Sequence, residues 1–374
     1  MTEKLPVIYL DHNATTPPHP VVVAAMFEAA SSTWGNSSSV HQIGRLARER
    51  IEQVRATIAR AMGAHPRDLL FTSGGTEANN LALFDAPAIV TSRLEHPSIT
   101  RVAEAVEKLG RKVRFLPVTP HGQIDHSTLD ETLAQLPKGT VVAVQAVNHE
   151  TGVVQPLEAI SAITTTHQAW LHIDAVQAVG KLENLRFCHG DSYSIAAHKF
   201  RGPKGIGALI WRCGRPAPKP LLRGGSQQRG FRPGTLDPIS VIGFGAAWER
   251  LSLSPSRHNQ IAPLRDRLEA QLASVAISNF DATAFVPERL SHVSSLWIPQ
   301  FRGEELVAAL DLEGVCISSG SACSAGTAEA SPVITAMYST ERALETVRVS
   351  LGEETTREEI DRAVVAFHRV LSRR

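Results

Sequence analysis

Residues able to do acid–base or nucleophilic chemistry follow five apolar runs in the first 200 positions of the chain. The runs are short and rich in β-branched residues, as strands are, and helical segments separate them. In order, they are DLLFT (68–72) before Gly75 and Thr76, AIVTS (88–92) before His96, TVVAVQAV (140–147) before His149, WLHI (170–173) before Asp174, and SYSIAA (192–197) before His198 and Lys199. Because parallel strands end at one edge of a sheet, these residues are expected to lie close together.

Together these groups suit pyridoxal 5'-phosphate (PLP). A lysine such as Lys199 forms a Schiff base with the cofactor, and a carboxylate such as Asp174 keeps its ring nitrogen protonated. The helix that begins in SGGTEANN (73–80) offers free N–H groups to a phosphate, and the ring of His96 can cover the cofactor face. Taken singly, each residue has an ordinary explanation, for example His96 as a helix cap. The combination predicts PLP as the cofactor and no metal.

The alternation of strands with helices predicts the fold class. We expect an α/β protein with a large cofactor-binding domain, whose mostly parallel sheet is covered by helices, and a smaller α+β domain. The pattern breaks after AAWERL (246–251). We therefore predict that the large domain spans 15–250, and that 1–14 and 251–374 form the small domain.

Composition excludes several classes of protein. The 374 residues carry a formal net charge of +1, so no strong field attracts nucleic acid or an anionic membrane. No run approaches the length of a membrane span, and MTEKLPVIYL has no signal-peptide core. The four cysteines show no CxxC spacing. One of them, Cys316, is expected to be a buried strand residue. This pattern favours a reducing, cytoplasmic location.

One cysteine stands in an unusual segment. Cys323 lies in ISSGSACSAG (317–326), where almost every neighbour is Ser, Gly or Ala. A surface loop that happens to hold a cysteine is the plain interpretation. The alternative is a reactive thiol that has to move, since Gly320 and Gly326 make a flexible tether.

Eight stretches in the order found here resemble the cysteine desulfurases, PLP enzymes of the class V aminotransferase group with fold type I. The resemblance runs from Tyr9 to about Glu359, and the combination of HK with GPKGIG and SSGSAC is its most specific part. The stretches are YLDHNATTP (9–17), FTSGGTEANN (71–80), EHPSI (95–99), NHETGVVQP (148–156), HIDAVQAVGK (172–181), AHKFRGPKGIGAL (197–209), RGFRPGT (229–235) and SSGSACSAG (318–326).

The resemblance implies a role for each site residue. It implies that Lys199 forms the Schiff base, that Asp174 pairs with the ring nitrogen, and that Cys323 receives the sulfur. It further implies that Gln177 contacts the cofactor hydroxyl and that His96 stacks on the cofactor ring and transfers protons. The residues implied to contact the phosphate are Gly75, Thr76, His198 and the second subunit's Thr235. Arg348 is implied to bind the substrate carboxylate. A bidentate guanidinium–carboxylate pair suits this last task.

The implied activity is removal of sulfur from L-cysteine. The products are L-alanine and a persulfide on Cys323, which passes to an acceptor such as an iron–sulfur scaffold, and the enzyme is a homodimer. A selenocysteine or cysteine lyase on the same scaffold remains open, but neither reaction requires a mobile cysteine. A plain aminotransferase has no use for Cys323, and a catalytically inactive scaffold protein is the non-enzymatic alternative.

Three positions depart from the pattern of this family. His149 replaces the second of two asparagines, which normally contacts the cofactor hydroxyl or the substrate. It can still donate a hydrogen bond, but it is larger and can titrate. Ala196 replaces a serine that contacts the phosphate, at a cost of about 1 kcal/mol. Pro233 replaces a serine in the RPGT turn. We expect these changes to affect rate and substrate preference rather than the reaction.

Overall fold

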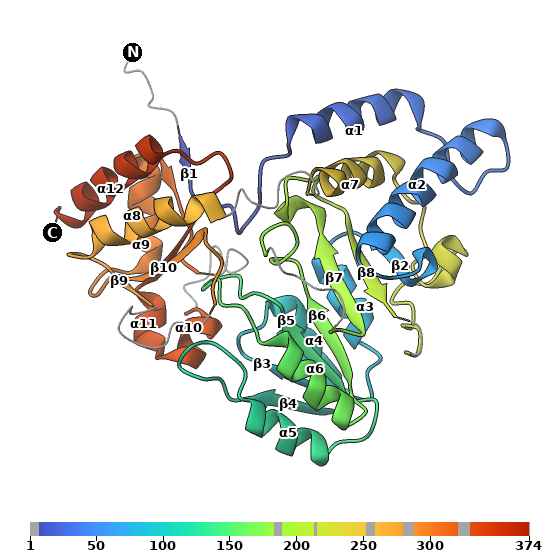
Figure 1. Ribbon diagram of the computed structural model, residues 1–374, viewed down its shortest axis with the longest axis horizontal. Coiled ribbons are helices and arrows are strands. Elements are labelled where there is room, and N and C mark those ends of the chain that lie inside the picture. The colour runs from blue at the N-terminus through green and yellow to red at the C-terminus, as the bar shows by residue number, and fades with distance from the viewer. Residues whose placement is uncertain are drawn as a thin grey trace.

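The structure is a computed structural model that describes residues 7–182, 189–212, 215–251, 259–279, 288–320 and 330–373. Figure 1 shows the arrangement of its elements, with the C-terminal helices and strands on one side of the molecule and the larger sheet on the other. Within the described ranges, no helix is both long and apolar enough to cross a membrane.

A seven-stranded sheet forms the centre of the larger part. Its order is β2 (Leu69–Thr72), β8 (Gly207–Trp211), β7 (Ser192–Ala196), β6 (Trp170–Asp174), β5 (Val141–Gln145), β3 (Ala88–Ser92) and β4 (Lys112–Leu116). Only β8 among these strands runs in the direction opposite to the other six. The carboxyl ends of the other strands therefore share one edge, as predicted.

Helices cover both faces of this sheet. One face packs against α1 (Pro20–Ser32), α2 (Gln42–Ala61), α5 (His126–Ala134), α6 (Leu157–Thr166) and α7 (Pro238–Leu251), and the other against α3 (Gly75–Leu83) and α4 (Pro97–Lys108). Alternate residues of β5 serve the two faces, Val142 and Val144 on the first and Val141 and Ala143 on the second. Burial on both faces explains why these strands are apolar throughout.

A second apolar core lies in the C-terminal part. It contains the antiparallel strands β12 (Thr346–Ser350), β10 (Val293–Trp297) and β9 (Ile277–Ser278), with helices α8 (Ala262–Leu272), α9 (Gly303–Leu312) and α12 (Arg357–Leu371). The N-terminal strand β1 (Ile8–Tyr9) pairs in parallel with β11 (Val315–Cys316), and Ile8 and Leu10 join this core. The domain boundary at 250/251 stays a prediction.

The remaining elements are short. They are α10 (Pro332–Met337), α11 (Thr340–Leu344) and the 3-10 helices η1 (Pro66–Asp68), η2 (Ala197–Lys199), η3 (Gln227–Gly230) and η4 (Asn259–Ile261). Lys199 thus ends a 3-10 turn that follows β7 directly. This turn holds its side chain at the carboxyl edge of the sheet.

The burial expected for Cys316 was wrong. It lies on a strand, but it is only half-buried, with its Sγ 3.8 Å from Asp311 Oδ1. The reason is that β11 belongs to a two-stranded sheet, which covers a side chain less completely than the central sheet does.

Phe244 on α7 provides a test of the main core. Its side chain is fully buried, with ring centroids 6.3 Å from Phe71 and 5.8 Å from Phe200. We expect Phe244→Ala to lower the free energy of unfolding by about 3–5 kcal/mol, measured by urea denaturation, because it leaves a cavity. The exposed Val365→Ala is the control and should change it by no more than about 0.5 kcal/mol. Equal effects of the two variants would contradict the packing described.

Candidate active site

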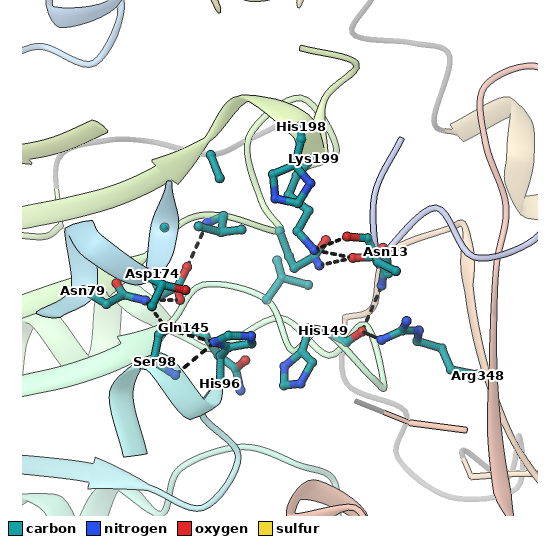
Figure 2. Close-up of a pocket in the computed structure, with 17 residues that line it drawn as sticks. Asn13, Asn79, His96, Ser98, Gln145, His149, Asp174, His198, Lys199 and Arg348 are labelled. Carbon is teal, nitrogen blue, oxygen red and sulfur yellow. Dashed lines mark hydrogen bonds between the residues drawn. The ribbon is translucent and has the colours of Figure 1, made fainter. Parts of the chain in front are cut away.

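A cavity of about 210 Å³ lies beyond the carboxyl ends of the parallel strands. Of the predicted site residues that the structure describes, all but Thr235 line it, and Figure 2 shows how several of them face one another. These residues are Gly75, Thr76, His96, His149, Asp174, Gln177, His198, Lys199 and Arg348. Residues far apart in the sequence thus meet in one pocket.

Asp174 at the end of β6 is buried, and each of its carboxylate oxygens accepts one of the hydrogen bonds described next. Its Oδ2 accepts a hydrogen bond from Asn79 Nδ2 (2.8 Å) and its Oδ1 accepts one from the amide of Val176 (2.9 Å). His172 Nε2 lies 3.0 Å from Asn79 Oδ1, which orients the amide so that its NH₂ group faces the carboxylate. These donors offset the desolvation of the acid. A carboxylate held in this way is able to pair with a protonated ring nitrogen.

His96 is fixed at the start of α4. Its Nδ1 accepts a hydrogen bond from the amide of Ser98 (3.1 Å) and lies 2.8 Å from the Ser98 hydroxyl, which in turn accepts one from Asn79 (2.8 Å). Burial lowers the pKa of His96, Lys199 lowers it further, and Asp174 opposes the shift. The ring is therefore neutral at pH 7 and carries its proton on Nε2. A neutral, anchored ring of this kind suits both stacking and proton transfer.

Lys199 is held by the main chain of an N-terminal segment. Its Nζ donates to the carbonyl oxygens of Asn13 (2.6 Å) and Ala14 (2.8 Å). The Asn13 carbonyl also accepts a hydrogen bond from Gln177 Nε2 (2.9 Å). The amine and this amide are thus held at one point beside the pocket.

Asn13 is a residue that the sequence analysis missed. Its Nδ2 donates to the carbonyl of His149 (3.0 Å), and its Oδ1 accepts from Lys181 Nζ (3.3 Å) and lies 2.9 Å from His292 Nε2. Lys181 is buried and also donates to Gln177 Oε1 (2.6 Å), and its pKa is well below the ordinary value because of burial and the nearby Lys199. Both residues lie in stretches that carried the resemblance, but nothing in the sequence indicated that they meet.

The helix start at Gly75 fits a phosphate. The N-terminus of α3 has no side-chain cap, and a Cβ at Gly75 would approach Val176 Cγ2 to 2.6 Å, so that glycine is required there. His198 Nδ1 lies 3.1 Å from the Thr15 hydroxyl. Burial, followed by the charges of Lys199 and Lys181, lowers the pKa of His198 to about 4. The pocket thus combines uncapped helical N–H groups for the phosphate of PLP, a lysine for its aldehyde and an acid for its ring nitrogen. This combination fits PLP.

Arg348 on β12 is the cation at the opposite side of the pocket. It is almost completely buried; its Nη2 lies 2.7 Å from Asp11 Oδ1 and its Nη1 donates to the carbonyl of His149 (3.1 Å). A buried guanidinium with a carboxylate partner is stable in this position, and its Nε–H, which has no partner among the described residues, is available to a second carboxylate.

His149 is the exception among the pocket histidines. Neither ring nitrogen has a hydrogen-bond partner among the residues that the structure describes, although Nε2 lies 3.5 Å from Glu150 Oε1. Burial lowers its pKa well below 6.5, as do the charges of His96, Arg348 and Lys199. Its side chain can therefore titrate only in acid.

Two predicted residues are not among those that line this pocket in the described part of the chain. Thr235 is exposed and does not line the pocket of its own chain. Cys323 belongs to residues 321–329, which lie outside the described part of the chain.

Comparison with known proteins identifies the family. Residues 8–363 match the model of the class-V aminotransferases. A cysteine desulfurase of Trichormus variabilis is 38% identical over 98% of this chain and 94% of its own. The structure of a NifS-like protein from Rickettsia africae, 31% identical, superposes with a TM-score of 0.88 over 98% of this chain and 99% of its own. SspA, solved in complex with cysteine, gives 0.79 at 29% identity over 93% and 99%.

The chain belongs to the class-V aminotransferases and, within them, to the cysteine desulfurases. Enzymes of this family depend on PLP. The resemblance, the fold class and the cofactor expected from the sequence are thereby confirmed.

His172 allows a test of the pocket's electrostatics. Burial lowers its pKa from 6.5 to about 3, so between these values the unfolded state binds more protons than the folded state. Stability is therefore lost as the pH falls from about 6.5, by up to about 1.4 kcal/mol per pH unit. We expect the loss between pH 7 and pH 5, measured by urea denaturation, to be about 2 kcal/mol smaller in His172→Gln than in the wild type. Parallel curves for the two proteins would refute this assignment.

Proposed function

We propose that the protein is a PLP-dependent cysteine desulfurase that converts L-cysteine to L-alanine and holds the released sulfur as a persulfide on Cys323. The observation that carries the proposal is the shared pocket of Lys199, Asp174 and Arg348, in which an amine, an acid and a carboxylate-binding cation face one cavity. The membership of the chain in the cysteine desulfurase family supports the same activity.

The cofactor would bind to residues on the side of the pocket next to the large sheet. Gly75, Thr76 and His198 would hold the phosphate, Asp174 the ring nitrogen and Gln177 the ring hydroxyl. The Gln177 amide has its oxygen committed to Lys181, so it offers a donor to the pocket. When bound, PLP draws electrons from the substrate through its protonated ring.

The remaining residues act on the substrate. Arg348 binds the carboxylate of the amino acid. Lys199 Nζ would hold the cofactor covalently until the substrate displaces it, and the freed amine exchanges the proton at Cα. His96 Nε2 moves a second proton. The Cys323 thiolate forms a bond with the substrate's sulfur while the Cβ–S bond breaks, and protonation at Cβ completes alanine. L-cysteine and one thiol thus give alanine and one persulfide, with no external oxidant or reductant.

Partners beyond the substrate are also part of the proposal. The enzyme acts as a homodimer in which Thr235 of each chain reaches the phosphate of the other, and the exposure of Thr235 outside its own pocket supports this. Large apolar side chains exposed along α1 and the segment after it also support association; these are Val21, Val23, Phe27, Trp34 and Val40. The acceptor is an iron–sulfur scaffold protein, in a cytoplasm that keeps the carrier thiol reduced.

Two variants test the chemistry. We expect Cys323→Ala to keep the yellow Schiff-base absorbance of the cofactor but to release alanine from cysteine at least about 100-fold more slowly, because the thiol that accepts sulfur is gone. Lys199→Ala should lose that absorbance as well as the activity. Normal cysteine turnover by Cys323→Ala would instead favour a lyase, and its turnover of selenocysteine would then identify which one.

Thr235 tests the dimer. The wild type should have a mass in solution of about two chains, by light scattering. Thr235→Val should bind PLP about fivefold more weakly through loss of one hydrogen bond. Thr165→Val, an exposed threonine on α6, serves as the control. A monomer that binds PLP equally well with either residue at position 235 would refute the shared site.

A further inference from the structure

The side chain of His149 faces the pocket without a hydrogen bond to any residue that the structure describes. The residue is only 7% exposed, and both ring nitrogens lack a partner among the described residues, as does Oε1 of the neighbouring Glu150. A buried polar group is normally satisfied, and an unsatisfied one lowers the stability of the protein. A group left in this state inside a ligand cavity indicates that the ligand provides the partner.

The position of the ring indicates which part of the ligand it meets. His149 lies between His96, whose ring centroid is 5.5 Å away, and Arg348, which contacts the His149 carbonyl (Figure 2). Asp174, which marks the cofactor, lies on the other side of His96 in this view, and Lys199 lies above the His149 ring. His149 is thus a neighbour of Arg348, the residue assigned to the substrate's carboxylate, and His96 lies between it and Asp174.

The backbone of His149 fixes this position. Its carbonyl accepts hydrogen bonds from Asn13 Nδ2 and from Arg348 Nη1, and these bonds fix the main chain from which the ring extends into the pocket. The next residue, Glu150, has Oε1 3.5 Å from His149 Nε2, and its Oε2 accepts a hydrogen bond from the Ser331 hydroxyl (2.6 Å). A small rotation would let the acid orient the imidazole while the other nitrogen, Nδ1, faces a ligand.

We propose that the imidazole of His149 hydrogen-bonds the side chain of the bound amino acid and selects substrates with a thiol or selenol over those with an aliphatic side chain. The inference rests on the proposed function, because that function places an amino acid on Arg348. A neutral imidazole nitrogen accepts a hydrogen bond from S–H or Se–H, whereas a methyl group offers none. The resemblance implies an asparagine at this position in the related enzymes, and its shorter side chain makes this contact particular to the present chain.

The test uses the holoenzyme with Cys323→Ala, which prevents turnover, and replaces His149 by Phe. This keeps a planar ring and removes both nitrogens. Binding of L-cysteine and L-alanine is followed through the absorbance of the cofactor. We expect the affinity for cysteine to fall about fivefold and that for alanine to change by less than about twofold. His167→Asn, at the end of α6 and outside the pocket, is the control for a histidine substitution.

Two measurements without substrate complete the test. The melting temperature of the apoprotein should not fall in His149→Phe, because no hydrogen bond within the protein is lost, and its affinity for PLP, measured by fluorescence, should change by less than about twofold. Equal losses of cysteine and alanine binding, a lower melting temperature or a large loss of PLP affinity would each overturn the inference. A wild type that binds both amino acids but releases no alanine would contradict the proposed function alone.

Discussion

The hydrogen bonds of Asp11, Asn13 and Ala14 to the pocket cations hold the active site together. Arg348 pairs with the Asp11 carboxylate at 2.7 Å, and Lys199 donates to the carbonyls of Asn13 and Ala14 at 2.6 and 2.8 Å. Burying a cation is costly unless it is paired and hydrogen-bonded. Without this segment the pocket would hold two cations with few acceptors, so the segment is needed both for stability and for function.

The same segment fixes the distance between the two ends of the pocket. On the C-terminal side, Leu10 and His12 pair with Ser350, which ends the strand that carries Arg348. On the sheet side, Thr16 exchanges hydrogen bonds with the backbone of His198 and Arg201, next to Lys199. Because one short stretch contacts both parts, the cofactor side and the substrate side are held in a defined relative position. Such preorganisation lowers the entropic cost of bringing reacting groups together.

How much of this could be predicted from the sequence depends on the range of each interaction. The strands before His96, Asp174 and Lys199 were predicted closely, because the sequence pattern of a strand is local. Their proximity was predicted because residues that follow parallel strands lie at the same edge of the sheet. The antiparallel direction of β8 was not predicted, since a short apolar run has no direction of its own. Asn13 and Asn79 were missed because their partners lie far away in the sequence, and a single asparagine carries no local signal of such contacts.

The histidines of the pocket show how a stable fold accommodates a reactive site. His96 and His198 in the pocket, and His172, which contacts Asn79, each have a hydrogen-bond partner, and burial keeps them neutral at little cost. His149 and Glu150 are more deeply buried than His96 and His198 but retain atoms without a partner among the described residues, which cost about 1–3 kcal/mol each. The apolar core around the large sheet stabilises the fold enough to offset that cost. Many unbonded polar groups spread through a domain would instead destabilise it. Apolar side chains could have replaced these unbonded buried groups, yet the groups are present at the ligand cavity. A bound group that completes their hydrogen bonds explains this. Occupancy of the pocket therefore stabilises the folded enzyme.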